Sequence, residues 1–218
     1  MKKLISLLPI LLSIMLIYDN KIVAQGIDSL QITKEFTELE EAFKAPEQVY
    51  RLNLSNKSLK GFAIGLSKFK NLRYLSLRND HLKSIPDEIT SLQKLQVLDL
   101  GGNDFEVLPV EFAKLKNLEE LYLDDDKNLN LSKDFEILGK LPKLKILHLD
   151  NDGINKIPFN INKLKHLESL YLSNNLLHFV PKQVVGLKSL KYLDLNHNPI
   201  NPNWNLNQQS DSGLKVKF

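Results

Sequence analysis

The chain has 218 residues, of which 43% are hydrophobic and 25% charged, and its formal net charge is +3. This length suits one ordinary domain or one modest solenoid, and the composition is that of a globular protein rather than a disordered one. The chain contains no cysteine, which excludes disulfides, thiolate metal sites and a cysteine nucleophile. It also has no long basic run and no aromatic-basic platform, so the sequence does not predict nucleic-acid binding.

Residues 1–24 have the features of a signal peptide. Lys2 and Lys3 precede an apolar run from Leu4 to Ile17, and Ala24 is a small residue at a suitable cleavage point. The run is shorter than the roughly 20 residues of a membrane-spanning helix. We therefore expect cleavage after Ala24 and a secreted, periplasmic or cell-surface protein of bacterial type. The alternative is an uncleaved segment that anchors the chain to the membrane; a lipoprotein anchor is excluded because it needs a cysteine.

Residues 25–48 are predicted to form an N-terminal helical cap. Ile32, Phe36, Leu39 and Phe43 recur at intervals of four, three and four, which places them on one face of a helix that ends before Pro46. A repeat stack exposes the apolar end of its first repeat, and a cap of this kind would cover it. The alternative is an amphipathic helix that binds a partner.

The longest part of the chain, residues 49–206, is built from repeats. The pattern LxxLxLxxDxL of residues 72–82 returns in full or weaker form from residues 49, 95, 118, 144, 167 and 190, mostly at intervals of 23. The LxL alternation predicts one short strand per copy, with its leucines in the core and the residues between them facing outward. In most copies a Leu-Pro-like pair such as Ile85-Pro86 follows, which predicts a turn on the opposite side.

These repeats resemble the leucine-rich repeat family, and specifically its 23-residue class LxxLxLxxNxLxxLPxxIxxLxx. The resemblance covers about 158 of the 218 residues. It implies an α/β solenoid: a right-handed arc of about seven repeats with a parallel, concave β-sheet. The family further implies that the concave face binds partners, most often proteins.

The outward strand positions therefore form the candidate binding surface. Tyrosine is common at binding hot spots because it offers a rigid apolar ring with a polar tip. The first strands carry arginines and the later ones carry carboxylates around aromatic rings, which favours a basic protein partner. The alternative is an ordinary solvated strand surface. The candidate partner-binding residues are Arg51, Tyr74, Arg78, Asp99, Tyr122, Asp124, His148, Asp150, Tyr171, Tyr192 and Asp194.

The ninth repeat position departs from the family pattern. It is usually Asn, whose amide bonds to the backbone of adjacent turns, but here it is Asp at residues 80, 126 and 152. A carboxylate accepts hydrogen bonds and cannot donate them, so we expect a weaker ladder there. Asp124, Asp125 and Asp150 lie close by in the sequence pattern. Such like charges raise one another's pKa or recruit a cation. The cluster is therefore either a set of acidic loops that face water or a Ca²⁺ site, because Ca²⁺ binds oxygen ligands.

Two further departures concern the fourth repeat and the carboxyl end. The fourth repeat has 26 residues and lacks the Leu-Pro turn, so we expect a bulge on the convex side. Trp204 is expected to cover the last core layer. Residues 207–218 are a polar tail; either it is disordered, or Leu214, Val216 and Phe218 add a short alternating strand.

No catalytic motif is present. The sequence lacks HExxH, GxSxG and the phosphate-binding GxxxxGK[ST]. His148 could join an acid–base cluster, but an open sheet offers no closed pocket. We therefore expect a non-catalytic protein-binding module of the cell envelope or exterior, without a cofactor or a metal. The alternatives are a surface adhesin that binds glycan or cell wall through its tyrosines, and a structural protein that associates with itself through its ends.

Overall fold

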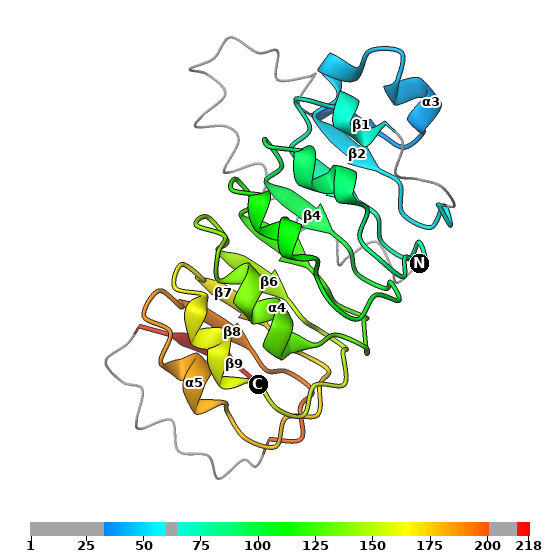
Figure 1. The fold of residues 1–218 in the computed structure, drawn as a ribbon. Coiled ribbons are helices and arrows are strands. Elements are labelled where there is room, and N and C mark those ends of the chain that lie inside the picture. The colour runs from blue at the N-terminus through cyan, green and yellow to red at the C-terminus, as the bar shows by residue number, and fades with distance from the viewer. Residues whose placement is uncertain (1–32, 60–64, 201–212) are drawn as a thin grey trace.

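The computed structural model describes residues 33–59, 65–200 and 213–218. These residues form a solenoid around one parallel sheet, in which nine strands follow one another in chain order (Figure 1). The strands are β1 (Glu35–Phe36), β2 (Arg51–Asn53), β3 (Tyr74–Ser76), β4 (Val97–Asp99), β5 (Glu120–Tyr122), β6 (Ile146–His148), β7 (Ser169–Tyr171), β8 (Tyr192–Asp194) and β9 (Lys215–Lys217).

The register confirms the predicted alternation. The strands β2–β8 are the seven predicted from the repeats, and each begins at the third position of its copy, so that Leu75 pairs with Leu98 and Leu98 with Leu121. The leucine at the centre of each of these strands is fully buried, and the leucine two residues later is at most 1% exposed. These two leucine columns form one continuous core along the solenoid.

Short helices cover the other side of this core. Pro86, Pro109, Pro158 and Pro181 each stand directly before a helix, where a missing N–H costs no helical hydrogen bond. The helices are α3 (Leu39–Ala42), η1 (Pro46–Gln48), η2 (Leu66–Lys68), η3 (Asp87–Ser91), η4 (Val110–Lys114), α4 (Leu131–Leu138), η5 (Phe159–Lys163) and α5 (Lys182–Val185).

The long fourth repeat forms α4, an eight-residue α-helix, in place of the short turns of its neighbours. Asn130 caps it, because its side chain accepts a hydrogen bond from the backbone N–H of Lys133. Asp134 is fully buried and accepts a hydrogen bond from the N–H of Leu108 in the preceding repeat. The predicted convex bulge is therefore a helix that is tied to its neighbour.

The amino end of the sheet differs from the prediction. One continuous helical cap over residues 25–48 is wrong for the described part, because Glu35 and Phe36 form β1 and pair with Arg51 and Leu52. Only the single turn of α3 and the short η1 follow. Phe36 does enter the core, with 6% of its surface exposed, but it does so from a strand.

At the carboxyl end the strand alternative is confirmed. Val216 pairs with Leu193 in β8, so β9 adds a ninth strand to the sheet. Trp204, the predicted cover of the last core layer, lies outside the described residues. The predicted signal segment also lies outside them.

The ninth repeat position forms a ladder along one edge of the sheet. The Asn103 amide donates to the carbonyls of Leu77 and Leu100 at 2.9 and 2.6 Å, while its oxygen accepts from the N–H of Asp80 and of Leu82. Asn175 repeats this arrangement with Leu149 and Leu172. The asparagines thus satisfy backbone groups on both sides.

The aspartates of the same ladder are only half satisfied, as predicted. One oxygen each of Asp80, Asp126 and Asp152 accepts a backbone N–H, while the other is buried without a hydrogen-bond partner among the described residues. Burial, reinforced by Asp124, Asp126 and Asp150, raises the pKa of Asp152 to about 9. Burial likewise raises the pKa of Asp126 to about 6. Asp152 therefore carries its proton at neutral pH.

The core packing gives a first prediction. Leu147 is fully buried at the centre of β6, so Leu147→Ala removes three side-chain carbons and leaves a cavity. We expect the free energy of unfolding in denaturant to fall by about 2–5 kcal/mol. Lys145→Ala, two residues earlier and exposed, should change it by less than about 0.5 kcal/mol. If Leu147→Ala left the free energy of unfolding unchanged, the strand register would be wrong.

The ladder gives a second prediction. The folded state holds the Asp152 proton up to about pH 9, whereas an unfolded Asp loses it near pH 4. The folded state thus binds more protons across this range, and the free energy of unfolding should fall as the pH rises through it. Asp152→Asn removes the titration and restores a donor. It should be more stable than the native chain by about 1 kcal/mol at about pH 8, with a flatter pH dependence. Equal pH profiles of the two proteins in urea unfolding would contradict this assignment.

Candidate functional site

The outward side chains of β2–β8 and the residues just after these strands form the concave face. Strand pairing aligns them in rows, so that Tyr122 lies beside His148 and His148 beside Tyr171. The outward positions are the third, fifth and seventh of each repeat. Over the seven repeats they contain two arginines and five carboxylates, which leaves an excess of negative charge. The carboxylates are Asp99, Glu120, Asp124, Asp150 and Asp194.

An aromatic row crosses the middle of this face. The ring centroids of Tyr122 and His148 are 3.9 Å apart, and those of His148 and Tyr171 are 4.3 Å apart, with the planes within 9° of parallel. Tyr192 follows at 5.3 Å from Tyr171, tilted by 49°. These separations follow from the strand spacing of about 4.8 Å, which brings equivalent side chains into contact. We call these four residues the aromatic row.

Glu120 fixes two rings of the aromatic row by contacts with their polar atoms. The Tyr122 hydroxyl donates to Glu120 Oε1 at 2.6 Å, and the same oxygen lies 3.0 Å from His148 Nε2. Glu120 is only 6% exposed. Burial, together with the Glu120 charge, raises the pKa of the Tyr122 hydroxyl, so that it stays protonated. Burial and the Asp194 carboxylate raise the pKa of Tyr192 to about 12.

Glu120 was not among the candidate residues that the sequence selected. Its position, two residues before Tyr122 on the same strand face, was the signal that could have found it. Tyr122 itself is 7% exposed, so it supports the row more than it offers surface. Tyr171 and Tyr192 are half-buried and are the accessible part of the row.

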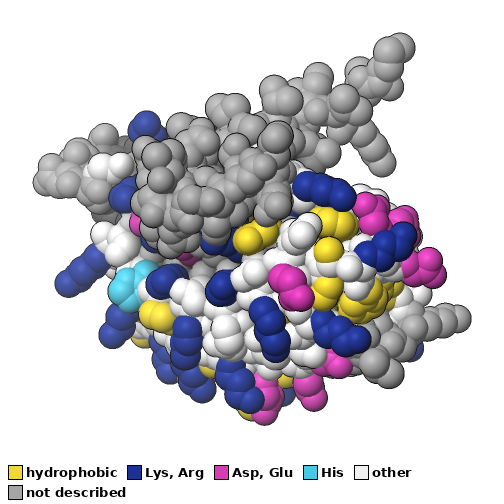
Figure 2. All heavy atoms as spheres, turned by 90° about the horizontal axis from the view of Figure 1, so that it is seen from above, with side chains coloured by type: hydrophobic (Ala, Val, Ile, Leu, Met, Phe, Trp, Pro, Cys, Tyr) yellow, Lys and Arg dark blue, Asp and Glu magenta, His cyan; other side chains and the backbone are white. Residues whose placement is uncertain are grey.

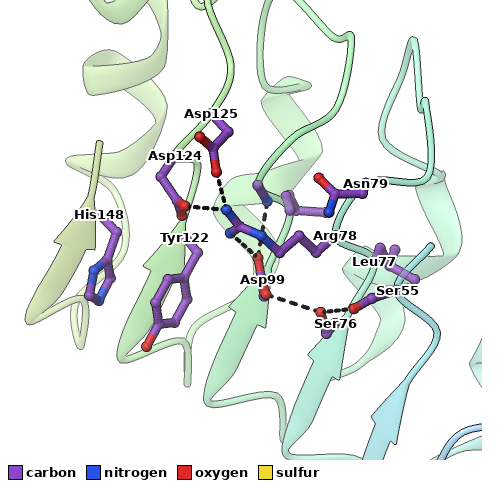
Figure 3. Close-up of polar contacts among 12 residues, drawn as sticks. Ser55, Ser76, Leu77, Arg78, Asn79, Asp99, Tyr122, Asp124, Asp125 and His148 are labelled. Atoms are coloured by element: carbon purple, nitrogen blue, oxygen red, sulfur yellow. Dashed lines mark hydrogen bonds and ion pairs between the residues drawn. The ribbon is translucent and has the colours of Figure 1, made fainter. Parts of the chain in front are cut away.

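The next part of the face is built around Arg78 (Figure 3). Its guanidinium lies 3.5 Å from Asp99 and 2.5 Å from Asp124, and it also contacts Asp125. Burial disfavours its charge, but the hydrogen bond and charge of Asp124 outweigh this, and the pKa of Arg78 is raised. A Cβ at Gly101 would come within 2.3 Å of Arg78, so glycine is what leaves room for this side chain.

Serines continue this network toward the amino end. Ser76 donates to Asp99 at 3.0 Å, and its hydroxyl is 2.7 Å from that of Ser55 (Figure 3). Arg51 pairs with Glu35 of β1 at 2.9 Å, and its guanidinium lies 4.0 Å from the centre of the Tyr74 ring. The basic amino end expected from the sequence is thus already paired with carboxylates.

The aspartates considered as Ca²⁺ ligands do not form one cluster in the structure, because they contact different partners. Asp124 and Asp125 contact Arg78, so the cation they recruit is a guanidinium. Asp150 instead accepts two hydrogen bonds from Ser173, and burial raises its pKa. Asp126 and Asp152 lie buried in the ladder. In the described ranges, no group of three or more His, Asp or Glu side chains is placed to hold a metal ion.

At the carboxyl end of the face, Asp194 is 7% exposed and accepts from the Tyr192 hydroxyl at 3.2 Å. Lys217 of β9 lies 3.6 Å from it. The structure therefore brings Tyr122, His148, Tyr171, Tyr192 and Asp194 together and places Arg51, Tyr74, Arg78, Asp99 and Asp124 in a separate polar network. Among the described helices, none is long and apolar enough to cross a membrane.

Solved structures with this fold come from several organisms. A leucine-rich repeat protein of Leptospira interrogans is 28% identical over 84% of this chain and 58% of its own, with a TM-score of 0.55. An internalin of Listeria monocytogenes is 23% identical over 78% of this chain and 48% of its own, with a TM-score of 0.60. The Toll–Spätzle complex of Drosophila matches at 23% identity, covering 68% of this chain and 20% of that one, with a TM-score of 0.57. The chain thus spans about half the length of the first two.

Family comparisons agree with these structures. No curated protein matches the chain. The family described as "Leucine-rich repeat region" matches residues 49–133, and the one described as "Leucine rich repeat" matches residues 142–200. With nine parallel strands in one open sheet, this chain belongs to the leucine-rich repeat family.

Proposed function

We propose that this chain is a non-catalytic protein-binding module that takes a basic segment of its partner on the concave face, around Tyr171 and Tyr192. The observation that carries the proposal is the aromatic row on an open sheet with an excess of carboxylates. Stacking already fixes the rings, so little side-chain entropy is lost when a partner binds. Carboxylates beside them favour lysine or arginine on the partner and steer its approach.

The arrangement of the rings favours a protein over a glycan. Tyr122, His148 and Tyr171 lie face to face, so the facing sides of their rings cover one another. A sugar that stacks on an aromatic residue needs an open ring face. The Tyr192 ring, tilted against its neighbour, is the exception within the row. Ring edges, hydroxyls and carboxylates instead suit the polar and charged groups of a protein surface.

We place this module in the cell envelope or outside the cell. The support is the basic and apolar segment before Ala24, which has the features of a signal peptide. The same fold occurs in the Toll–Spätzle complex, which is support at the level of the fold only.

The test is affinity capture from the native cell envelope with two matched baits. The first carries Tyr171→Ala and Tyr192→Ala. The second carries Phe159→Ala and Phe179→Ala, which removes two aromatic rings that are 76% and 72% exposed outside the concave face. We expect the first bait to bind the captured protein at least about tenfold more weakly and the second to bind like the native chain. Added salt should weaken native binding.

Stability measurements accompany the capture. Tyr171→Ala should lower the free energy of unfolding by about 1–3 kcal/mol, because the ring is half-buried and its loss removes one stacked and one tilted ring pair. Loss of binding by the Phe159 and Phe179 bait alone would place the site outside the concave face. Retention on polysaccharide that salt does not weaken would replace the protein partner with a glycan.

A further inference from the structure

The strands β3–β8 are each preceded by a six-residue segment at the same repeat positions. These segments are residues 68–73, 91–96, 114–119, 140–145, 163–168 and 186–191. The strands are parallel and in register, so all six segments lie along one edge of the solenoid, the edge at which the strands begin. We call this edge the basic rim.

The charge of the basic rim is strongly one-sided. It contains twelve lysines and Arg73 but only two carboxylates, Glu119 and Glu168, for a net charge of +11. The whole chain carries +3, so everything outside the rim sums to −8. The opposite edge, where the strands end, carries the aspartates of the ladder and of the Arg78 network. The excess of basic charge thus lies along one edge of the solenoid.

The rim lysines are available to a partner. All twelve are exposed. Lys145, Lys163 and Lys191 pair with glutamates at 3.9, 2.5 and 2.5 Å. The other nine form no ion pair within 4.0 Å with any residue that the structure describes. Figure 2 shows dark-blue Lys and Arg side chains gathered over the lower left of the molecule, with few carboxylates among them.

The composition of the rim indicates the kind of partner. Lysine is a hydrated point charge on a flexible stem, suited to a diffuse field of anions, whereas bidentate recognition of single phosphates or carboxylates favours arginine. The one Phe, Tyr or Trp in the six segments is Phe69, which is fully buried, so no such ring is exposed on which bases could stack. These features disfavour a nucleic acid and a specific anion pocket.

The shape of the rim favours an extended surface. Six strands spaced by about 4.8 Å give an edge on the order of 25 Å long. Because the strands start in register, their preceding segments end at one level, and the lysines form an array along the edge, with one pocket of about 380 Å³ between residues 140–145 and 163–168. Such an array matches the plane of lipid headgroups, where each lysine near an anionic surface adds to the attraction.

We propose that the basic rim docks the protein on an anionic lipid bilayer and leaves the concave face open to its partner. The two faces are built from different residues, so the rim can bind lipid whether or not the concave face binds a protein. The contact is electrostatic, and no segment needs to enter the hydrocarbon.

The test is flotation of the chain from Gln25 onward, as expected after cleavage, with phosphatidylcholine vesicles, with and without phosphatidylglycerol. The rim variant carries Lys70→Gln, Lys114→Gln, Lys165→Gln and Lys188→Gln. The control carries Lys83→Gln, Lys127→Gln, Lys133→Gln and Lys156→Gln, four exposed lysines outside the rim, so both variants change the net charge equally. All three proteins begin at Gln25, so the predicted signal segment is absent from each.

The native chain and the control should bind vesicles that contain phosphatidylglycerol, within about twofold of each other, and added salt should release both. The rim variant should bind about tenfold more weakly or worse, with an unchanged thermal melt. Equal loss by the rim variant and the control would reduce the effect to net charge and overturn the proposal. Equal binding of the native chain to both vesicle types would also overturn it, as would binding to soluble dextran sulfate but not to vesicles.

Discussion

The structure depends on one constraint: parallel strands of three residues must stay in register while their side chains alternate between two sides. Register keeps Leu75, Leu98 and Leu121 in one buried column, and the alternation sends Ser76, Asp99 and Tyr122 to the other side. A shift by one residue would exchange the two sets. The core, the concave face and the two edges of the solenoid all follow from this arrangement.

Identical spacing also brings like groups together, and the protein handles them in three ways. Aromatic rings at equivalent positions stack, as Tyr122, His148 and Tyr171 do. Carboxylates near Arg78 share its guanidinium. Aspartates in the ladder are buried, and burial raises the pKa of Asp152 to about 9, so that this side chain keeps its proton at neutral pH. The first arrangement leaves Tyr171 and Tyr192 accessible on an open surface, the second is paired within the chain, and the third leaves one buried oxygen of each ladder aspartate without a partner among the described residues.

Much of the fold could be predicted because the same strand pattern recurs in seven repeats. The seven strands, their inward leucines and the outward rows follow from the pattern alone. The ends could not be predicted, because a single copy has no repeat to fix its period: Phe36, Leu39 and Phe43 fit a helix, yet Phe36 lies on a strand. The tail gave the opposite case, where a weak alternation around Val216 did form a strand.

The sequence predicted which residues share the concave face, but it did not predict which of their side chains touch. Sequence position placed Arg78 and Asp124 on one face, but side-chain length and the room left by Gly101 decide that they touch. Glu120 was missed because its role depends on the Tyr122 hydroxyl reaching back along its own strand. The basic rim is visible in the sequence as lysines at fixed repeat positions. That these lysines form one surface follows only from the fold, which brings the six segments to one edge.

The most direct test of the central claim is site-specific photocrosslinking in the native cell envelope. Tyr171 is replaced with p-benzoylphenylalanine in one protein, and Phe159, on the helical side, in a matched protein. A partner on the concave face predicts a crosslinked protein from position 171 and none from position 159. The same crosslink from position 159, without one from position 171, would contradict the account and place the binding surface on the helical side.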